Sequence, residues 1–159
     1  MNVRDIMTKQ ASFCGTDTTL AEASGLMKQS NRGFLPVIGE GGNVIGVITD
    51  RDICIALGTR NLRPSDLRVW DVMSPRLFTC TPEDTVHSAL KTMLIEHIRR
   101  LPVIDREGTL AGVLSVDDIA LHSAEYAFSQ DATYRDVEDT YKSVCCHATI
   151  RANPREAIV

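Results

Sequence analysis

Two short stretches of the sequence combine residue types that are suited to holding a nucleotide. They are GVITDRD at residues 46–52 and GVLSVDD at residues 112–118. In both, a hydroxyl side chain follows the glycine by three residues, and a carboxylate follows the hydroxyl by three more. A helix that begins at the hydroxyl offers free N–H groups and a dipole that attract phosphate. The carboxylate can accept hydrogen bonds from two ribose hydroxyls, and the glycine lets another group approach the strand closely. The pattern is therefore typical of a nucleotide site.

The same spacing also has a purely structural interpretation. Thr49 and Asp52, like Ser115 and Asp118, are spaced as in a capping box, where a hydroxyl and a carboxylate satisfy backbone N–H groups at a helix start. Such a box needs no ligand. Because a duplicated unit also duplicates its caps, the repetition alone does not decide between the two interpretations.

Both stretches belong to an internal repeat with an offset of 66 residues. Residues 3–53 align with residues 69–119 without a gap, and 16 of the 51 aligned pairs are identical. The run LPVI, for example, occurs at residues 35–38 and again at 101–104. Self-similarity at a fixed offset is the signature of a repeated supersecondary unit. The chain therefore contains two copies of one unit.

The same succession of elements is predicted for each copy. Thr19 and Glu22 form a capping box that begins a helix with an apolar stripe, and residues 82–85 begin the equivalent helix of the second copy. Two apolar runs joined by a glycine-containing turn then predict a hairpin, which a further helix follows. The expected strands are 34–38 and 44–48 in the first copy and 101–104 and 110–114 in the second, and the expected last helices are 50–57 and 117–124.

Each unit is thus β-α-β-β-α, so the fold class is α/β (α+β). A unit of about 50 residues buries only a marginal core on its own. We therefore expect the two copies to pack sheet to sheet about a pseudo-twofold axis. Residues 1–58 are assigned to the first domain, 59–68 to a linker with turn-forming residues, and 69–122 to the second domain.

Residues 123–159 form a C-terminal extension outside the repeat. Residues 123–130 are expected to extend the last helix. An apolar stripe that includes Val137 and Tyr141 predicts a further short helix over residues 132–144. The residues from 145 onward carry weak signals and favour an extended segment. We expect the apolar stripe to pack on the core of the same chain or on a dimer partner.

Composition and charge argue against several classes of protein. The formal net charge is −4 and the basic residues are scattered, so no nucleic-acid-binding face is expected. No apolar run approaches the roughly 20 residues of a membrane span. The first ten residues lack the apolar core of a secretory signal. The sequence therefore predicts a cytoplasmic protein that does not associate with membranes.

The five cysteines lack the spacing of a disulfide framework, so free thiols are expected. Cys14, Cys54 and Cys80 lie in or near apolar segments and are expected to pack as small hydrophobic side chains. Cys145 and Cys146 are adjacent, whereas zinc ligands are usually two to four residues apart. No metal site is predicted.

Taken together, these motifs resemble a tandem pair of cystathionine beta-synthase (CBS) domains, often called a Bateman module. The resemblance covers roughly residues 1–122 and comprises DIM or DVM at the start of each copy, LPVI midway and the Gly-x-x-Thr/Ser-x-x-Asp string. It implies binding of adenosine compounds, including AMP, ATP and S-adenosylmethionine, in clefts between the two sheets.

The resemblance also implies roles for individual residues. Asp52 and Asp118 would each hold a ribose, assisted by Thr49 and Ser115. The segments that would border the two bases are Gly33, Phe34 and Leu35 in the first copy, and Arg99, Arg100 and Leu101 in the second.

The two implied sites are not equivalent. Arg51 precedes Asp52 and can make a charge-assisted contact with phosphate, worth about 1.5–3 kcal/mol. Its counterpart, Asp117, would repel a phosphate. We therefore expect the first site to take a charged nucleotide and the second to bind more weakly or to take an uncharged adenosyl group. A position of Arg51 on the surface, without a ligand, stays open as the alternative.

These observations lead to one main functional hypothesis and two alternatives. The main hypothesis is a regulatory sensor of adenine nucleotides, with no obligatory cofactor, that forms a homodimer and signals in trans to an unknown protein partner. The first alternative is a structural dimerisation module with empty clefts. The second is an enzyme, which we do not favour because the sequence lacks a nucleophile–base pair, a metal set and a Walker loop.

Overall fold

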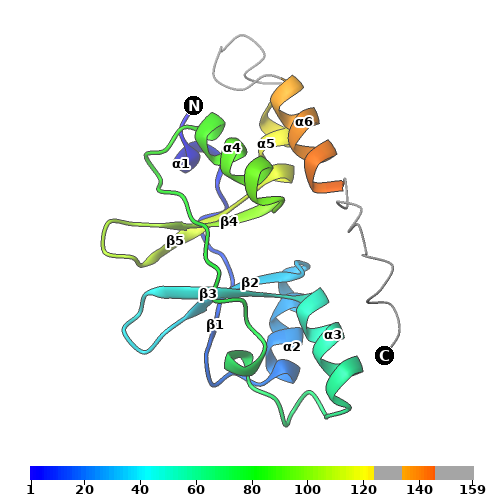
Figure 1. Ribbon diagram of the computed structural model, residues 1–159. Helices are drawn as coiled ribbons and strands as arrows, with labels where there is room; N and C mark the ends of the chain where they lie inside the picture. The colour runs from blue at the N-terminus through cyan, green and yellow to red at the C-terminus, as the bar shows by residue number, and fades with distance from the viewer. Residues whose placement is uncertain (124–133, 146–159) are drawn as a thin grey trace.

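The computed structural model describes residues 1–123 and 134–145 and consists of two stacked domains (Figure 1). In each domain, helices cover the outer face of a small sheet, and the two sheets face each other across the middle of the molecule (Figure 1). The predicted mixed α/β class and the sheet-to-sheet packing of two similar repeats are therefore confirmed.

The first domain contains a three-stranded sheet and two helices. Its sheet has the order β1-β2-β3, in which β1 runs parallel to β2 and β2 runs antiparallel to β3. Thr19 caps the first helix by accepting a hydrogen bond from the Glu22 N–H, as the sequence predicts. The elements are β1 (Cys14–Gly15), α2 (Leu20–Ser30), β2 (Phe34–Ile38), β3 (Val44–Thr49) and α3 (Asp50–Arg60), the last reaching two residues into the predicted linker.

The second domain repeats this arrangement. Strands β4 and β5 pair in the same register as β2 and β3, with an irregularity at the equivalent position. The counterpart of β1 is reduced to an isolated parallel bridge between Cys80 and Val103. The elements are α4 (Val86–Glu96), β4 (Arg100–Ile104), β5 (Leu110–Ser115) and α5 (Val116–Ser123).

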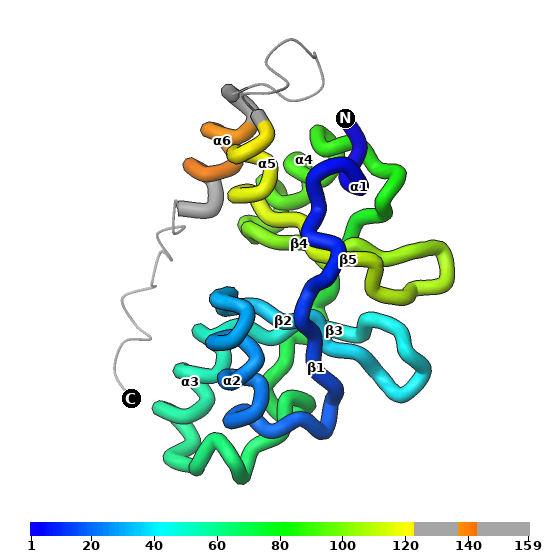
Figure 2. The backbone as a smooth tube through the Cα atoms, turned by 180° about the vertical axis from the view of Figure 1, so that it is seen from behind, coloured from blue at the N-terminus to red at the C-terminus, as the bar shows by residue number. Residues whose placement is uncertain are grey.

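The segment that begins each copy packs in the other domain. The short helix α1 (Val3–Ile6) places both of its terminal residues in the core of the second domain, and the 3-10 helix η1 (Val69–Asp71) places Val69 in the core of the first. Figure 2 shows the N-terminal segment running from the second domain down to β1 of the first. The spatial domains therefore exchange their first segments relative to the repeats in the sequence.

After α1 and η1, each exchanged segment, which we call the crossing segment, forms an isolated antiparallel bridge with the last strand of the other copy's sheet. Thr8 and Val113 exchange two backbone hydrogen bonds of 2.9 and 3.0 Å, and the equivalent residues Ser74 and Val47 exchange two of 2.9 and 3.1 Å. These paired crossings tie the domains together and form walls between the two sheets.

Helix α6 (Tyr134–Cys145) packs on α4 and α5 of the second domain (Figure 1). Val137 lies in that domain's core, Tyr141 packs against it, and Thr140 is buried. The helix predicted over residues 132–144 is thus confirmed for residues 134–144, which the structure describes, and packs on the core of its own chain. The predictions for residues 124–130 and 146–159 lie outside the described residues. None of the described helices is long and apolar enough to cross a bilayer.

Candidate functional site

The strand-to-helix corner of the first domain is closed by a capping box. The Asp52 N–H donates to Thr49 Oγ1 at 3.2 Å, while the N–H and the hydroxyl of Thr49 both donate to Asp52 Oδ2, at 2.9 and 2.7 Å. The structural interpretation of this spacing is therefore correct. The other carboxylate oxygen, Oδ1, accepts no hydrogen bond from the described residues and stays available to a ligand.

The corner of the second domain is built in the same way. The N–H and the hydroxyl of Ser115 donate to Asp118 Oδ2 at 2.9 and 2.5 Å, and the Asp118 N–H donates to Ser115 Oγ at 3.1 Å. Ser115 is buried, while Asp118 is half-buried. Each corner thus fixes its aspartate against the helix start with one carboxylate oxygen.

The N–H groups at the start of α3 are not free for an anion. The Asp50 N–H donates to the Gly33 carbonyl oxygen at 3.2 Å. The Arg51 N–H donates to Asp50 Oδ1 at 2.8 Å, and the Asp52 N–H donates to Thr49 Oγ1 at 3.2 Å. The expected phosphate site on this helix end is therefore wrong as stated, because the chain's own acceptors occupy it. A phosphate near this corner must be held by side chains.

The group that approaches Gly46 and Gly112 belongs to the chain itself. A Cβ atom added at Gly46 would lie 2.6 Å from the Ser74 carbonyl oxygen, and one added at Gly112 would lie 2.5 Å from that of Thr8. As expected, these glycines let another group approach the strand closely, but that group is the crossing segment of the other copy.

A cleft between the two sheets opens beside the first corner, and we call it the first cleft. Its volume is about 460 Å³, within the range of roughly 300–1,000 Å³ for small-molecule sites. Both copies contribute to its walls, and four of its lining residues are arginines. The lining residues are Gly33, Phe34, Val47, Thr49, Asp50, Arg51, Arg76, Phe78, His97, Ile98, Arg99, Arg100 and Pro102.

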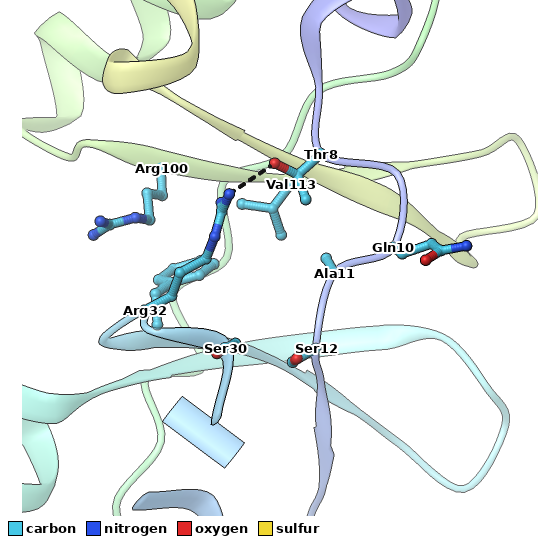
Figure 3. Close-up of a pocket in the computed structure, with 9 residues that line it drawn as sticks. Thr8, Gln10, Ala11, Ser12, Ser30, Arg32, Arg100 and Val113 are labelled. Atoms are coloured by element: carbon cyan, nitrogen blue, oxygen red, sulfur yellow. Dashed lines mark hydrogen bonds between the residues drawn. The ribbon is translucent and has the colours of Figure 1, made fainter. Parts of the chain in front are cut away.

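The pseudo-symmetric counterpart, the second cleft, is smaller, with a volume of about 260 Å³ (Figure 3). Arg32 reaches across it from the first domain and donates to Thr8 Oγ1 at 3.0 Å (Figure 3). This bridge holds one guanidinium in place inside the cleft. The lining residues are Thr8, Gln10, Ala11, Ser12, Ser30, Arg32, Phe34, Arg100 and Val113.

The structure divides the predicted site residues into three groups. Gly33, Thr49, Arg51 and Arg99 line the first cleft alone, and Phe34 and Arg100 line both clefts. Arg99 thus lies beside the first corner rather than the second. Asp52, Ser115 and Asp118 are not among the residues that line either cleft. The side chains of Leu35 and Leu101 are fully buried in the two cores, so only their backbone can face a ligand.

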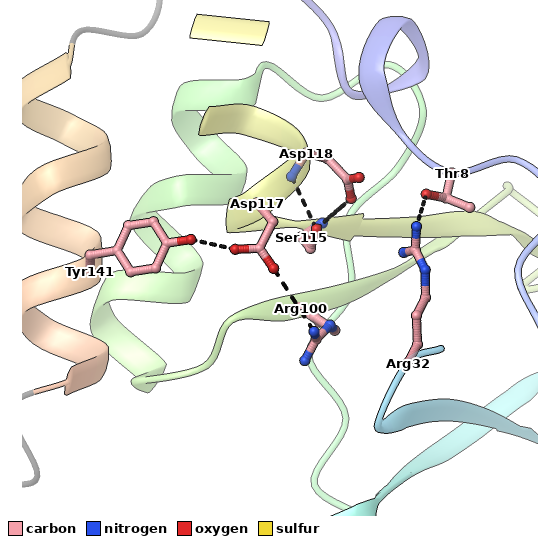
Figure 4. A network of polar contacts seen from close by, with 7 residues as sticks. All are labelled: Thr8, Arg32, Arg100, Ser115, Asp117, Asp118 and Tyr141. Carbon is pink, nitrogen blue, oxygen red and sulfur yellow. Dashed lines mark hydrogen bonds and ion pairs between the residues drawn. The ribbon is translucent and has the colours of Figure 1, made fainter. Parts of the chain in front are cut away.

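Arg100 lies in a polar network that extends to the C-terminal helix (Figure 4). One of its terminal nitrogens is 4.0 Å from Asp117 Oδ2, and Asp117 also accepts a hydrogen bond from the Tyr141 hydroxyl. Asp117, which we expected to repel phosphate, thus has a cation beside it. The Arg100 Nε is buried without a hydrogen-bond partner among the described residues.

Several cleft residues were not identified from the sequence. Arg76 and Phe78 belong to the crossing segment of the second copy but line the cleft beside the corner of the first. The guanidinium of Arg76 lies 4.9 Å from the centre of the Phe78 ring and is paired with Glu96 at 2.8 Å. Each copy's corner faces the other copy's crossing segment, a pairing that no local sequence pattern indicates.

The cysteines with described side chains are free thiols in two environments. Cys14 and Cys80 occupy equivalent buried positions, and burial raises their pKa values to about 11 and about 12. Cys54 is exposed, so the expectation that it packs as a hydrophobic side chain is wrong. In the part of the chain that the structure describes, no three His, Cys, Asp or Glu side chains gather as metal ligands.

Comparison with known proteins agrees with this architecture. The CBS domain family matches residues 3–59 and 69–125. The CBS domain-containing protein YhcV of Bacillus subtilis is 36% identical over 121 residues, which cover 76% of this chain and 84% of that protein.

Two solved structures share the fold. The CBS domain pair of protein MJ0100, in complex with 5'-methylthioadenosine and S-adenosyl-L-methionine, superposes with a TM-score of 0.71 at 23% identity, covering 79% of this chain and 98% of that one. CBSX2 in complex with AMP gives a TM-score of 0.68 at 24% identity, covering 79% and 97%. The chain therefore belongs to the CBS domain family and contains two copies of that domain in tandem.

Proposed function

We propose that this chain is a regulatory module that binds an adenine nucleotide or an adenosyl compound between its two CBS domains and signals occupancy in trans. The observation that carries the proposal is the first cleft, which has the volume of a small-molecule site and four lining arginines. Related folds in complex with AMP, and with 5'-methylthioadenosine and S-adenosyl-L-methionine, support the adenosine class.

The geometry of the first cleft favours a phosphate-bearing ligand. Since the N–H groups of α3 already have acceptors, the phosphate would contact Arg51, Arg99 and Arg100, where charge-assisted hydrogen bonds are strong. Phe34 and Phe78 add aromatic surface for a base. Asp52 does not line the first cleft, so the ribose role proposed for it requires the ribose to reach its unused Oδ1 at the corner, because Oδ2 is committed to the capping box.

The proposal includes further properties that follow from the sequence. The module would need no obligatory cofactor, would catalyse no reaction, would act in the cytoplasm as a homodimer and would report to a separate protein partner. A coupling of 1–3 kcal/mol between ligand and partner is typical of such regulation. Incubation of the purified protein with ATP or AMP should yield no product by chromatography, and turnover that copurifies with the protein would contradict this part.

Isothermal titration with AMP, ADP, ATP and S-adenosylmethionine tests the binding. We expect saturable heat with at least one of them, and a loss of about tenfold or more in AMP affinity in Arg51→Ala. Arg106→Ala is the matched control, because Arg106 is an exposed arginine on the β4–β5 turn that lines neither cleft. No heat with any of the four compounds, together with a stable dimer in sedimentation, would favour the ligand-free dimerisation module instead.

A further inference from the structure

Where the two domains meet, the two copies carry different residue types at equivalent positions. Phe34 opens β2 and Arg100 opens β4, 66 residues later, so the two residues are equivalent in the repeat. They pair with the equivalent hydroxyl residues Thr49 and Ser115. Both Phe34 and Arg100 line both clefts. The pseudo-symmetric clefts therefore share one aromatic ring and one guanidinium.

The guanidinium of Arg100 is poorly satisfied where it lies. Its Nε is buried without a hydrogen-bond partner among the described residues. Its terminal nitrogen lies 4.0 Å from a carboxylate oxygen of Asp117, beyond hydrogen-bond distance, and the Asp117 side chain is 65% exposed. A pair at this distance, with an exposed carboxylate and an arginine side chain that is 24% exposed, contributes little. Arg100 can therefore turn toward an anion in either cleft at small cost.

The other arginines of the clefts are not shared. Arg51 and Arg99 line the first cleft alone, and Arg32 lines the second cleft alone, where its hydrogen bond to Thr8 holds it. Arg100 is thus the single described cation that lines both clefts.

We propose that Arg100 determines ligand specificity in both clefts and makes them interdependent. Because the Arg100 side chain can turn into only one of the two clefts at a time, it serves the phosphate of one ligand at a time. When a phosphate-bearing ligand in the first cleft engages Arg100, the second cleft loses its affinity for phosphate and accepts an uncharged adenosyl ligand. This inference rests on the proposed function, because it concerns the ligands of the same clefts.

Titration with AMP and adenosine tests the interdependence. In the wild-type chain we expect a second AMP to bind at least tenfold more weakly than the first, whereas adenosine binds the AMP-loaded protein as tightly as it binds the second cleft of the free protein. Arg100→Phe, which makes the two copies alike at this position, should weaken the first AMP at least tenfold and reduce the difference between the two AMP steps to less than threefold. Adenosine binding should change by less than threefold.

Blocking the first cleft tests whether Arg100 serves both clefts or the first cleft alone. The double variant Arg51→Trp/Arg99→Trp fills that cleft from two exposed positions, so the fold should persist, as circular dichroism can verify. If Arg100 is shared, the open second cleft should now bind AMP at least tenfold more tightly than the second step in the wild type. Adding Arg100→Phe should abolish this gain.

The outcomes distinguish the two proposals. Equal affinity for two AMP molecules in the wild type, or no gain in the blocked variant while adenosine still binds, would overturn the sharing of Arg100 and leave the proposed function intact. An absence of binding by AMP, ADP, ATP, S-adenosylmethionine and adenosine alike would overturn both.

Discussion

Replacing Gly112 with alanine should destabilise the protein strongly, because the backbone of the crossing segment lies against this glycine. The added Cβ would sit 2.5 Å from the Thr8 carbonyl oxygen, whereas carbon–oxygen contacts normally begin near 3.3 Å, so the segment must move by about 0.8 Å. That shift strains both backbone hydrogen bonds between Thr8 and Val113. Overpacking costs about 1–3 kcal/mol and each lost hydrogen bond about 0.5–1.5 kcal/mol, so we expect a loss of about 2–4 kcal/mol.

Gly25 provides the matched control for the same chemical change. It is exposed within α2, and a Cβ added there would meet nothing within 4 Å. Alanine is the better helix former by about 0.5–1 kcal/mol, so Gly25→Ala should stabilise the protein. One substitution type is thus predicted to act with opposite sign at the two sites.

Urea unfolding followed by circular dichroism measures both changes. The two midpoints should move in opposite directions, and unchanged slopes would show that the denatured states remain comparable. If Gly112→Ala unfolds at the wild-type urea concentration or above it, the crossing segment does not lie against β5 as described, and the walls assigned to both clefts are wrong.

Three further predictions concern the corner, the thiols and the exchanged segment. Asp52→Ala should lower the free energy of unfolding by about 1 kcal/mol through loss of the capping box, and it should also weaken the binding of adenosine ligands. If titration well below the melting temperature finds the ligand affinity unchanged, the carboxylate has a structural role only. In a Cys145→Ser/Cys146→Ser background, a maleimide at pH 8 should modify Cys54 and spare Cys14 and Cys80, because the raised pKa values of the two buried thiols keep them protonated at that pH. Peptide mass spectrometry identifies the modified cysteines, and fast labelling of Cys14 and Cys80 would contradict their buried placement. Ile6→Ala should cost about 2–5 kcal/mol and accelerate hydrogen exchange first in α4 and α5; a response confined to the first domain would contradict the exchange of segments.

The sequence alone determined the features that depend on a few neighbouring residues. The 66-residue repeat, the helix start at Thr19 and the hairpin strands at 34–38 and 44–48 were predictable, because caps and apolar periodicity act within one or two turns of chain. The helix over 132–144 followed from the same periodicity.

The tertiary structure alone decided how these elements build the clefts. The exchange of α1 and η1 between the domains, and the pairing of Thr8 and Ser74 with the last strands of the opposite sheets, depend on contacts between residues far apart in the chain. Gly112 shows the limit most plainly: its spacing indicated a close approach, but nothing near it in sequence specifies that Thr8 is the group that approaches. Likewise, the sequence predicted that Arg100 borders one base, and only the packing of the two sheets places its side chain between two clefts.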